Sequence, residues 1–148
     1  MNKPELCVSH QPDETLVSEL RENLRSYNFS AAGEYALEPF LISHRSEKNA
    51  LMGGVFAYLR FQWLIIDLLW VHDDYRRNGL GARLLQKAEE IALSYGVNRF
   101  RLNTASFQKG LSLCQKQGYE IFAELPCANM VDGKLVAFTD YYLKKEVR

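Results

Sequence analysis

The stretch WLIIDLLWVHDDYRRNGLGARLLQKAEEIALSYG, from Trp63 to Gly96, decides the fold of this chain. It opens with an apolar run that is rich in branched and aromatic residues and carries one charge, Asp67. Such a run predicts a strand buried on both faces. After a turn, apolar residues recur at helical spacing from Leu80 to Tyr95, opposite a charged face. The stretch therefore predicts a buried strand, a tight turn and an amphipathic helix.

The turn between this strand and this helix has the composition of an anion site. Gly79 and Gly81 stand at the start of the helix, where unsatisfied backbone N–H groups carry a partial positive charge. Glycine keeps side chains away from an incoming anion, and arginines nearby add full charges. These arginines are Arg76, Arg77 and Arg83. The pattern predicts a site for phosphate, most plausibly a diphosphate. It is not a Walker loop, since no Gly-Lys-Ser/Thr follows, and Leu84 replaces the third glycine of a dinucleotide fingerprint.

The strand Asp67–Val71 followed by DYRRNGLG at 74–81 resembles the acetyl-CoA site of the GNAT superfamily of N-acetyltransferases. The family pattern is a strand ending in Val, a short turn, Arg/Gln-x-x-Gly-x-Gly/Ala and a long helix. The resemblance implies that the diphosphate of acetyl-CoA rests on the turn and that its pantetheine arm pairs with the strand. The implied cofactor-binding residues are Leu69, Trp70, Val71, Arg76, Arg77, Asn78, Gly79, Leu80, Gly81 and Ala82. Asn103 is a further candidate for the arm, or a loop cap. Arg83 and Lys87 either reach another phosphate or form a solvated helix face.

The composition is that of one globular domain. A chain of 148 residues can bury a substantial core, and 47% of its residues are hydrophobic. Acidic and basic residues number 18 each, so no polyanion partner is implied and nucleic acid binding is disfavoured. The three cysteines give neither a disulfide framework nor a metal pattern, which fits a reducing cytoplasm. No signal peptide and no membrane-spanning segment are expected.

The rest of the chain predicts further strands and two more helices. A first strand is expected at 5–10, then a helix that starts at the N-cap Asp13 and ends before a loop at 28–33. Strands are expected at 35–43 and 50–60, with Gly53 and Gly54 marking a bulge or a close approach. Beyond the central helix the expected order is a parallel strand at 99–104, a short helix at 109–117, a strand at 119–125, a loop at 126–133 and a final strand at 135–146.

This order predicts an α/β (α+β) fold. By resemblance it is a GNAT-like, mostly antiparallel mixed sheet of about seven strands with helices on both faces. Its central parallel pair splays apart at the carboxyl ends of the strands. Residues 1–148 are expected to form a single acetyltransferase domain.

Asp67 is the candidate general base. Acyl transfer to an alkyl amine needs a neutral amine, and an ammonium pKa of about 10.4 calls for a base or desolvation at neutral pH. Asp67 lies four residues before Val71, where many GNAT proteins have Glu. Alternation along the strand is expected to place Asp67 on the same face as Leu69 and Val71. The alternative is a structural aspartate paired in the sheet. A backbone N–H near Trp70 or Val71 is the expected oxyanion donor.

Cys114 departs from the family pattern. In LSLCQKQGY, at 111–119, it stands four residues before Gly118, where many GNAT proteins have a tyrosine that acts as general acid. Cys114 is thus a candidate that lines the acetyl site, with inert packing as the alternative.

The leading hypothesis is an acetyl-CoA-dependent N-acetyltransferase that acts on an amine of a small molecule or peptide by direct attack. One alternative is a non-catalytic module that binds or senses acyl-CoA, and another is a protein that binds ATP or a dinucleotide. No metal, nucleic acid or membrane is expected to take part. Dimers are common among proteins of this pattern, so a homodimer is an open expectation.

Overall fold

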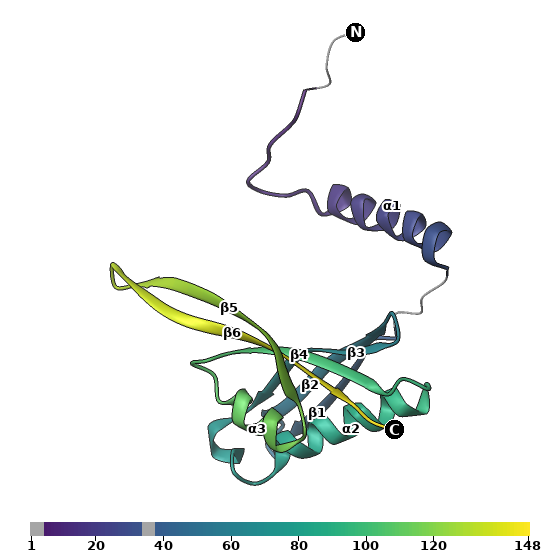
Figure 1. The fold of residues 1–148 in the computed structure, drawn as a ribbon. Helices are drawn as coiled ribbons and strands as arrows, with labels where there is room; N and C mark the ends of the chain where they lie inside the picture. The colour runs from purple at the N-terminus through teal and green to yellow at the C-terminus, as the bar shows by residue number, and fades with distance from the viewer. Residues whose placement is uncertain (1–4, 34–37) are drawn as a thin grey trace. The chain divides into compact units, whose positions relative to one another are not determined.

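The computed structural model describes residues 5–33 and 38–148 (Figure 1). It divides the chain into two compact units, Met1–Tyr35 and Ala36–Arg148. The single-domain organisation expected for the chain stays a prediction. No helix in the described part of the chain combines the length and the apolar character needed to cross a bilayer.

The first unit consists of an extended segment and one helix, α1 (Glu14–Ala32). Residues 5–12 form neither helix nor strand, so the strand expected at 5–10 is wrong. The N-cap prediction is confirmed, because the side chain of Asp13 accepts a hydrogen bond of 2.8 Å from the N–H of Thr15. The loop expected at 28–33 is wrong, since the helix continues to Ala32 and ends at Gly33, whose φ is +82°. Asn and Ser in the last turn are only weakly unfavourable in a helix, and glycine is the stronger stop signal.

Among the residues that the structure describes, the second unit is built on a sheet of six strands, where the sequence predicts about seven. The strand order is β1-β2-β3-β4-β6-β5, and β3 and β4 form a parallel pair among antiparallel neighbours. The strand expected at 35–43 begins among residues that the structure does not describe. The strands are β1 (Phe40–Arg45), β2 (Leu51–Arg60), β3 (Trp63–Val71), β4 (Arg99–Ala105), β5 (Glu120–Val131) and β6 (Lys134–Glu146).

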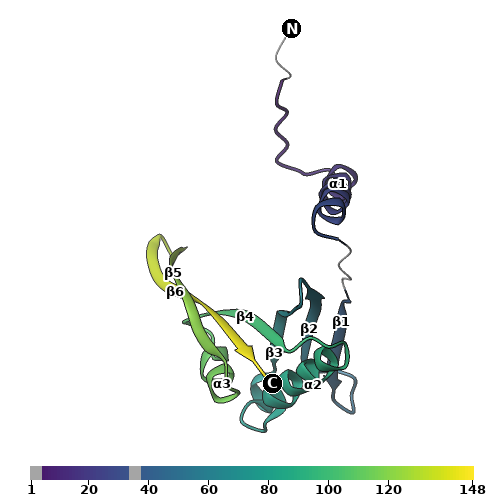
Figure 2. The same ribbon diagram turned by 45° about the vertical axis from the view of Figure 1, so that its right-hand side comes forward.

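Helices α2 (Leu80–Ser94) and α3 (Gly110–Lys116) lie on the same side of this sheet (Figures 1 and 2). The apolar stripe of α2 is buried against β1, β2 and β3, while α3 packs against β4. Leu85, Leu64, Phe100 and Leu143 are among the fully buried side chains of the core between the two layers. The expected helix on the opposite face of the sheet stays a prediction.

A buried polar cluster joins α2 to the last strand. Glu89 of α2 accepts hydrogen bonds from the Tyr119 hydroxyl at 2.9 Å and from Lys145 at 3.0 Å. Burial and the neighbouring Glu89 charge raise the pKa of Tyr119, which keeps its hydroxyl protonated as a donor. The carboxylate is therefore buried with a cation and a hydroxyl as partners, as a charge inside a protein requires.

Strands β5 and β6 form a long hairpin that projects from the sheet (Figure 1). The loop expected at 126–133 is wrong, since β5 runs through Pro126 to Val131. Only Asp132 and Gly133 connect the strands, with φ of +49° and +76°. Two left-handed residues in a two-residue loop are the geometry of a type I′ turn. β5 is an edge strand, and an edge tolerates proline because one side of it carries no ladder bonds.

Candidate functional site

The parallel strands β3 and β4 separate after only two paired positions. Leu64 pairs with Phe100 and Ile65 with Arg101, and no later residue of β3 is paired with β4. The strands nevertheless continue to Val71 and Ala105. The backbone groups of the last part of β3 that face β4 are thus without a strand partner. This confirms the splayed pair predicted from the sequence.

A β-bulge at Asp67 changes which side chains of β3 face the core. Phe56 of β2 pairs with Leu68 and Ala57 pairs with Ile66, which leaves Asp67 as the extra residue. Beyond the bulge Leu69 and Val71 pack against the core, while Leu68 and Trp70 are 63% and 46% exposed.

One expectation about β3 is therefore corrected. Asp67 is exposed and does not share a face with the core-packed Leu69 and Val71, because the extra residue shifts the alternation. Within residues 38–148, α2 and α3 cover one face of β3, and burial of its other face stays a prediction. The Asp67 carboxylate has no hydrogen bond or ion pair with any other described residue, and solvent exposure removes the cost of burying it.

The α2 N-terminus lies directly beyond the turn that follows β3. Gly79 is the N-cap residue, with φ of +77° and no side chain to cap the helix. The first intrahelical bond runs from the Arg83 N–H to the Gly79 carbonyl, at 3.0 Å. The N–H groups of Leu80, Gly81 and Ala82 therefore precede the hydrogen-bonded ladder of the helix. A Cβ at Gly79 would meet no atom within 4 Å beyond its chain neighbours, so a ligand has room to approach this end.

Arg76 holds the turn together. Its Nε donates to the Val71 carbonyl at 3.1 Å, and its guanidinium forms an ion pair of 2.5 Å with Asp73 in the short 3-10 helix η1 (Asp73–Tyr75). Arg77 adopts a φ of +73°, which makes the turn tight, and Arg77 and Asn78 are both exposed. The two arginines thus differ: Arg76 braces the strand end, and Arg77 presents an exposed cation beside the helix N-terminus.

His72 is part of the same turn. Its Nδ1 accepts a hydrogen bond of 3.1 Å from the N–H of Asp74, so it caps η1, and its ring meets Trp70 edge-on at 5.9 Å. The acceptor role requires an unprotonated Nδ1.

Gly81 has a packing role that the sequence did not reveal. A Cβ at this position would lie 2.7 Å from Leu113 Cδ2 of α3 and 3.7 Å from Val71 Cγ2 of β3. The missing side chain makes room for α3 as well as keeping the helix end open. Gly53 is similar, since a Cβ there would lie 2.9 Å from Leu80 Cδ2. It would also lie 3.1 Å from the Trp70 carbonyl oxygen, which confirms the expected close backbone approach.

Cys114 lies in the hydrophobic core, with 1% of its surface exposed. Burial, reinforced by the Glu89 charge, raises the pKa of its thiol from 9.0 to about 11. Such a thiol is a weaker acid than a coenzyme A thiol, whose pKa is close to the cysteine reference of about 8.5, so it is poorly suited to protonate the leaving thiolate. The side chain contributes to packing of the core, and a place for Cys114 beside the acetyl group stays a prediction.

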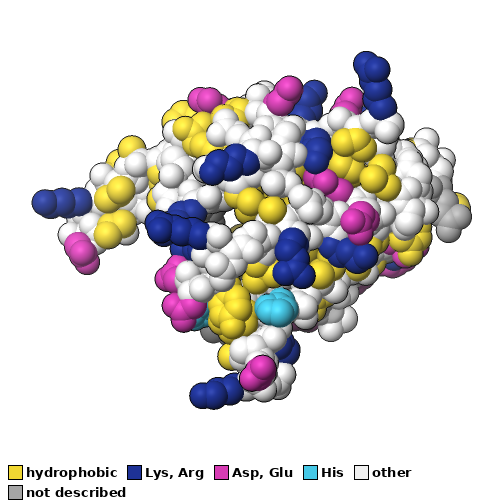
Figure 3. All heavy atoms as spheres, turned by 90° about the horizontal axis from the view of Figure 1, so that it is seen from below, with side chains coloured by type: hydrophobic (Ala, Val, Ile, Leu, Met, Phe, Trp, Pro, Cys, Tyr) yellow, Lys and Arg dark blue, Asp and Glu magenta, His cyan; other side chains and the backbone are white. Residues whose placement is uncertain are grey.

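A groove of about 420 Å³ runs between β1 and α2. Arg83 and Lys87 line it from the helix, and His44 lines it from the strand. Lys87 also pairs with Glu90 at 3.1 Å. Two cations therefore lie along the first turns of α2 beyond its uncapped end. On the face drawn in Figure 3 basic and acidic side chains are interspersed and form no large patch of one sign.

Asn103 on β4 contacts a carboxylate that sequence reasoning missed. Its side-chain amide donates to both oxygens of Asp140 on β6, at 3.3 Å each. The negative charge of Asp140, with some burial and a hydrogen bond, raises the pKa of Tyr142. Asn103 is two residues beyond the last position paired with β3, so the cluster lies beside the splay.

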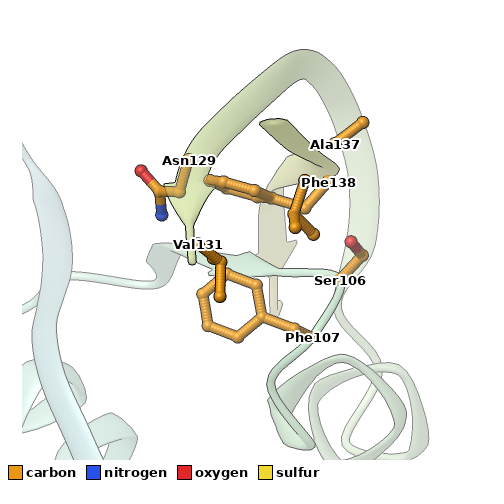
Figure 4. Close-up of a pocket in the computed structure, with 7 residues that line it drawn as sticks. Ser106, Phe107, Asn129, Val131, Ala137 and Phe138 are labelled. Carbon is orange, nitrogen blue, oxygen red and sulfur yellow. The ribbon is translucent and has the colours of Figure 1, made fainter. Parts of the chain in front are cut away.

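An apolar pocket of about 390 Å³ lies between the end of β4 and the long hairpin (Figure 4). The rings of Phe107 and Phe138 meet edge-to-face with centroids 5.1 Å apart, and Val131 lies next to them. The other lining residues are Ser106, Asn129, Val136 and Ala137. Sequence reasoning treated 126–133 as a loop and so did not predict this pocket.

Comparisons with known proteins agree with this architecture. The model of a family described as the acetyltransferase (GNAT) family matches residues 6–119. Blasticidin-S acetyltransferase of Streptomyces morookaense is 35% identical over 91 residues, which cover 61% of this chain and 66% of that protein. An acetyltransferase of Agrobacterium fabrum is 32% identical over 77 residues, 52% of this chain and 56% of its own. The chain thus matches about two thirds or less of the length of these curated relatives.

Solved structures extend the likeness to most of the fold. A protein of Agrobacterium tumefaciens described as an acetyltransferase superposes with a TM-score of 0.82 at 23% identity, over 97% of this chain and 100% of that one. A Bacillus anthracis protein described as a streptothricin acetyltransferase, solved with acetyl coenzyme A, gives a TM-score of 0.62 at 16% identity, over 74% and 63%.

Proposed function

The chain belongs to the acetyltransferase (GNAT) family, and on that premise we propose that it transfers an acetyl group from acetyl-CoA to an amine of a small molecule or peptide. The match to the family over residues 6–119 supports the reaction class. The observation that carries the proposal is the juxtaposition of an uncapped helix N-terminus with a parallel strand pair that opens beside it. A diphosphate suits the first feature and an amide-bearing arm suits the second.

The residues at the turn fit coenzyme A in chemistry and in space. The free N–H groups of Leu80, Gly81 and Ala82 would donate to the diphosphate, and the exposed Arg77 and Asn78 would flank it. Arg76 would contribute indirectly, by holding the turn in the conformation that places these groups around the diphosphate. The unpaired backbone of Leu69, Trp70 and Val71 would pair with the pantetheine amides. Arg83 and Lys87, in the groove beside α2, would meet a further phosphate.

Acetyl-CoA supplies a thioester whose carbonyl carbon accepts the amine nitrogen. A C–N bond forms, the C–S bond breaks, and the amine loses a proton while the thiolate leaves. On this chain the exposed carboxylate of Asp67 would take that proton, directly or through a water. A backbone N–H at Trp70 or Val71 would stabilise the oxyanion. Because Cys114 is buried, we infer that the thiolate leaves without it and is protonated by solvent.

Turnover of a panel of amines, followed by release of free thiol, tests the activity. The panel should include blasticidin S and streptothricin, which the names of similar proteins suggest as acceptors. We expect thiol release with at least one amine. Tight binding of acetyl-CoA with no turnover by any amine would favour the alternative of an acyl-CoA-binding module.

A matched pair at Gly79 tests the coenzyme site. Asn and Asp tolerate the left-handed backbone of Gly79, so both should fold. Gly79→Asp adds a negative charge where the diphosphate is expected, while Gly79→Asn adds the same bulk without it. We expect coenzyme A affinity, measured by calorimetry, to fall at least tenfold more in Gly79→Asp. Equal affinities in the two variants would contradict the site.

A further inference from the structure

We propose that Asp140 and the apolar pocket beside it bind the acceptor, and that the acceptor is an amine whose ring-sized apolar group lies close to its cationic group. The inference rests on the acetyl-transfer function proposed above and identifies the class of its second substrate.

The first support is a row of side chains on one face of β4 and β6. Asn103 pairs with Tyr142, and Ala105 pairs with Asp140. The pairing continues one step further, because Ser106 donates its N–H to the Thr139 carbonyl at 2.8 Å and its hydroxyl accepts from the Thr139 N–H at 3.0 Å.

Continued by one more residue, this pairing would bring Phe107 opposite Phe138. The edge-to-face contact of their rings, with centroids 5.1 Å apart, agrees with this placement. Alternate residues of a strand share a face, so Asp140 and Phe138 project from the same side of β6, and Asn103 of β4 meets Asp140 on that side. Phe107 lies in the turn that follows β4, and its ring reaches this side through its contact with Phe138.

The second support is the charge of Asp140. Its carboxylate is partly buried and receives the Asn103 amide, but no Lys, Arg or His among the described residues forms an ion pair with it. A carboxylate can accept about four hydrogen bonds, so an ammonium can still bind. Asn103 orients the carboxylate from β4, the strand that borders the splay. A cation at Asp140 is therefore held next to the opening assigned to the thioester.

The third support is the character of the pocket. Its volume of about 390 Å³ is at the small end of the range for ligand sites. Phe107, Phe138, Val131 and Val136 make its lining apolar, and Asn129 adds one amide. Phe138 and Asp140 are two residues apart on one strand, roughly 7 Å along it. An acceptor that uses both features carries its cationic group about that distance from a ring or a similar apolar group.

Steady-state kinetics with two probe amines tests the proposal. 2-Phenylethylamine carries a ring within this distance of its ammonium, and ethanolamine carries no ring. We expect kcat/KM for 2-phenylethylamine to exceed that for ethanolamine at least tenfold. Asp140→Asn should raise its KM at least tenfold and leave the KM for acetyl-CoA unchanged. Val136→Ala should reduce the preference for the ring-bearing amine.

Two control variants separate these effects from loss of folding. Glu124→Gln removes a carboxylate on β5 that pairs opposite Tyr141, on the other face of the hairpin. Leu135→Ala shortens an exposed side chain next to Val136. Both should keep the wild-type preference. An equal preference for the two amines, or an unchanged KM in Asp140→Asn, would overturn the inference while acetyl transfer still stands.

Binding measured by NMR on the protein loaded with coenzyme A distinguishes this inference from failure of the proposed reaction. If no amine is acetylated, 2-phenylethylamine should still perturb the signals of Phe107 and Phe138 in the wild type and not in Asp140→Asn. That result supports the pocket and rejects the reaction. Absence of any perturbation in the wild type rejects the pocket.

Discussion

The buried thiol of Cys114 makes the stability of the chain depend on alkaline pH. The pKa of this thiol is raised from 9.0 to about 11 in the folded state. Between these values an unfolded chain loses the thiol proton and the folded chain keeps it, so stability falls as pH rises. Because one proton is involved, the free energy of unfolding falls by at most about 1.4 kcal/mol for each pH unit in this range.

We therefore expect Cys114→Ala to flatten the decline in unfolding free energy between pH 9 and 11, measured by urea titration. Cys7→Ala, which alters an exposed thiol, is the control and should leave the slope as in the wild type. Acetyl transfer by Cys114→Ala and Cys114→Ser should stay within about tenfold of wild type, a barrier change under about 1.4 kcal/mol. A thousandfold loss in both, with folding intact, would restore a catalytic role to this residue.

The exposed carboxylate of Asp67 predicts a pH-dependent loss of rate when it is removed. An alkyl ammonium deprotonates without help only near its pKa of about 10.4. Asp67→Asn should therefore slow turnover about a hundredfold at neutral pH and recover partly as pH rises. The melting temperature should not change, because Asp67 has no partner among the residues that the structure describes. A rate loss that is uniform across pH, together with a lower melting temperature, would instead indicate a structural aspartate.

The contact between α2 and α3 predicts coupling at Gly81. Gly81→Ala places a methyl group 2.7 Å from Leu113 Cδ2, so the Leu113 side chain must shift, and we expect this overpacking to cost up to about 1–3 kcal/mol. In a Leu113→Ala background the same change should be neutral or stabilising. Urea unfolding of the four members of this double-mutant cycle measures the coupling. If Gly81 serves only to admit phosphate, Gly81→Ala will leave stability unchanged and lower coenzyme A affinity alone.

The sequence predicted the elements whose signals are local. The apolar run with one charge, the glycine turn and the 3.6-residue periodicity of α2 were enough to place β3, the turn and the helix. The bulge at Asp67 was not predictable in the same way. Every neighbour in WLIIDLLWV is apolar, so the pattern carries no marker of a shifted alternation.

The hairpin shows a signal that was present and was missed. Asp132-Gly133 is a strong signature of a two-residue hairpin turn, yet the whole of 126–133 was interpreted as a loop. That error also hid the pocket. Nothing in the local sequence predicts the contact between Asn103 and Asp140. The two residues are far apart in the chain and meet only because β4 and β6 are neighbours in the sheet.

At the scale of the whole molecule, ligand linkage tests which cofactor the fold accepts. A ligand at about a hundred times its Kd adds about 2.7 kcal/mol to stability. For a chain of 148 residues this should raise the melting temperature by roughly 5–10 °C. We expect coenzyme A and acetyl-CoA to produce this shift and ATP and NAD to produce little. An equal shift with ATP or NAD would favour the nucleotide-binding alternative.

The strand order has a consequence for how the chain is made. β6 is synthesised after β4 and β5 but lies between them in the sheet. While a ribosome is still adding residues 134–146, β4 and β5 have no central partner, and the cation that neutralises Glu89 has not yet been delivered. β1, β2, β3 and α2 can assemble during translation, because their contacts are with neighbours already made. The half of the sheet that carries the proposed acceptor pocket cannot form until β6 has been made. It is therefore the part of the nascent protein that most needs protection by chaperones.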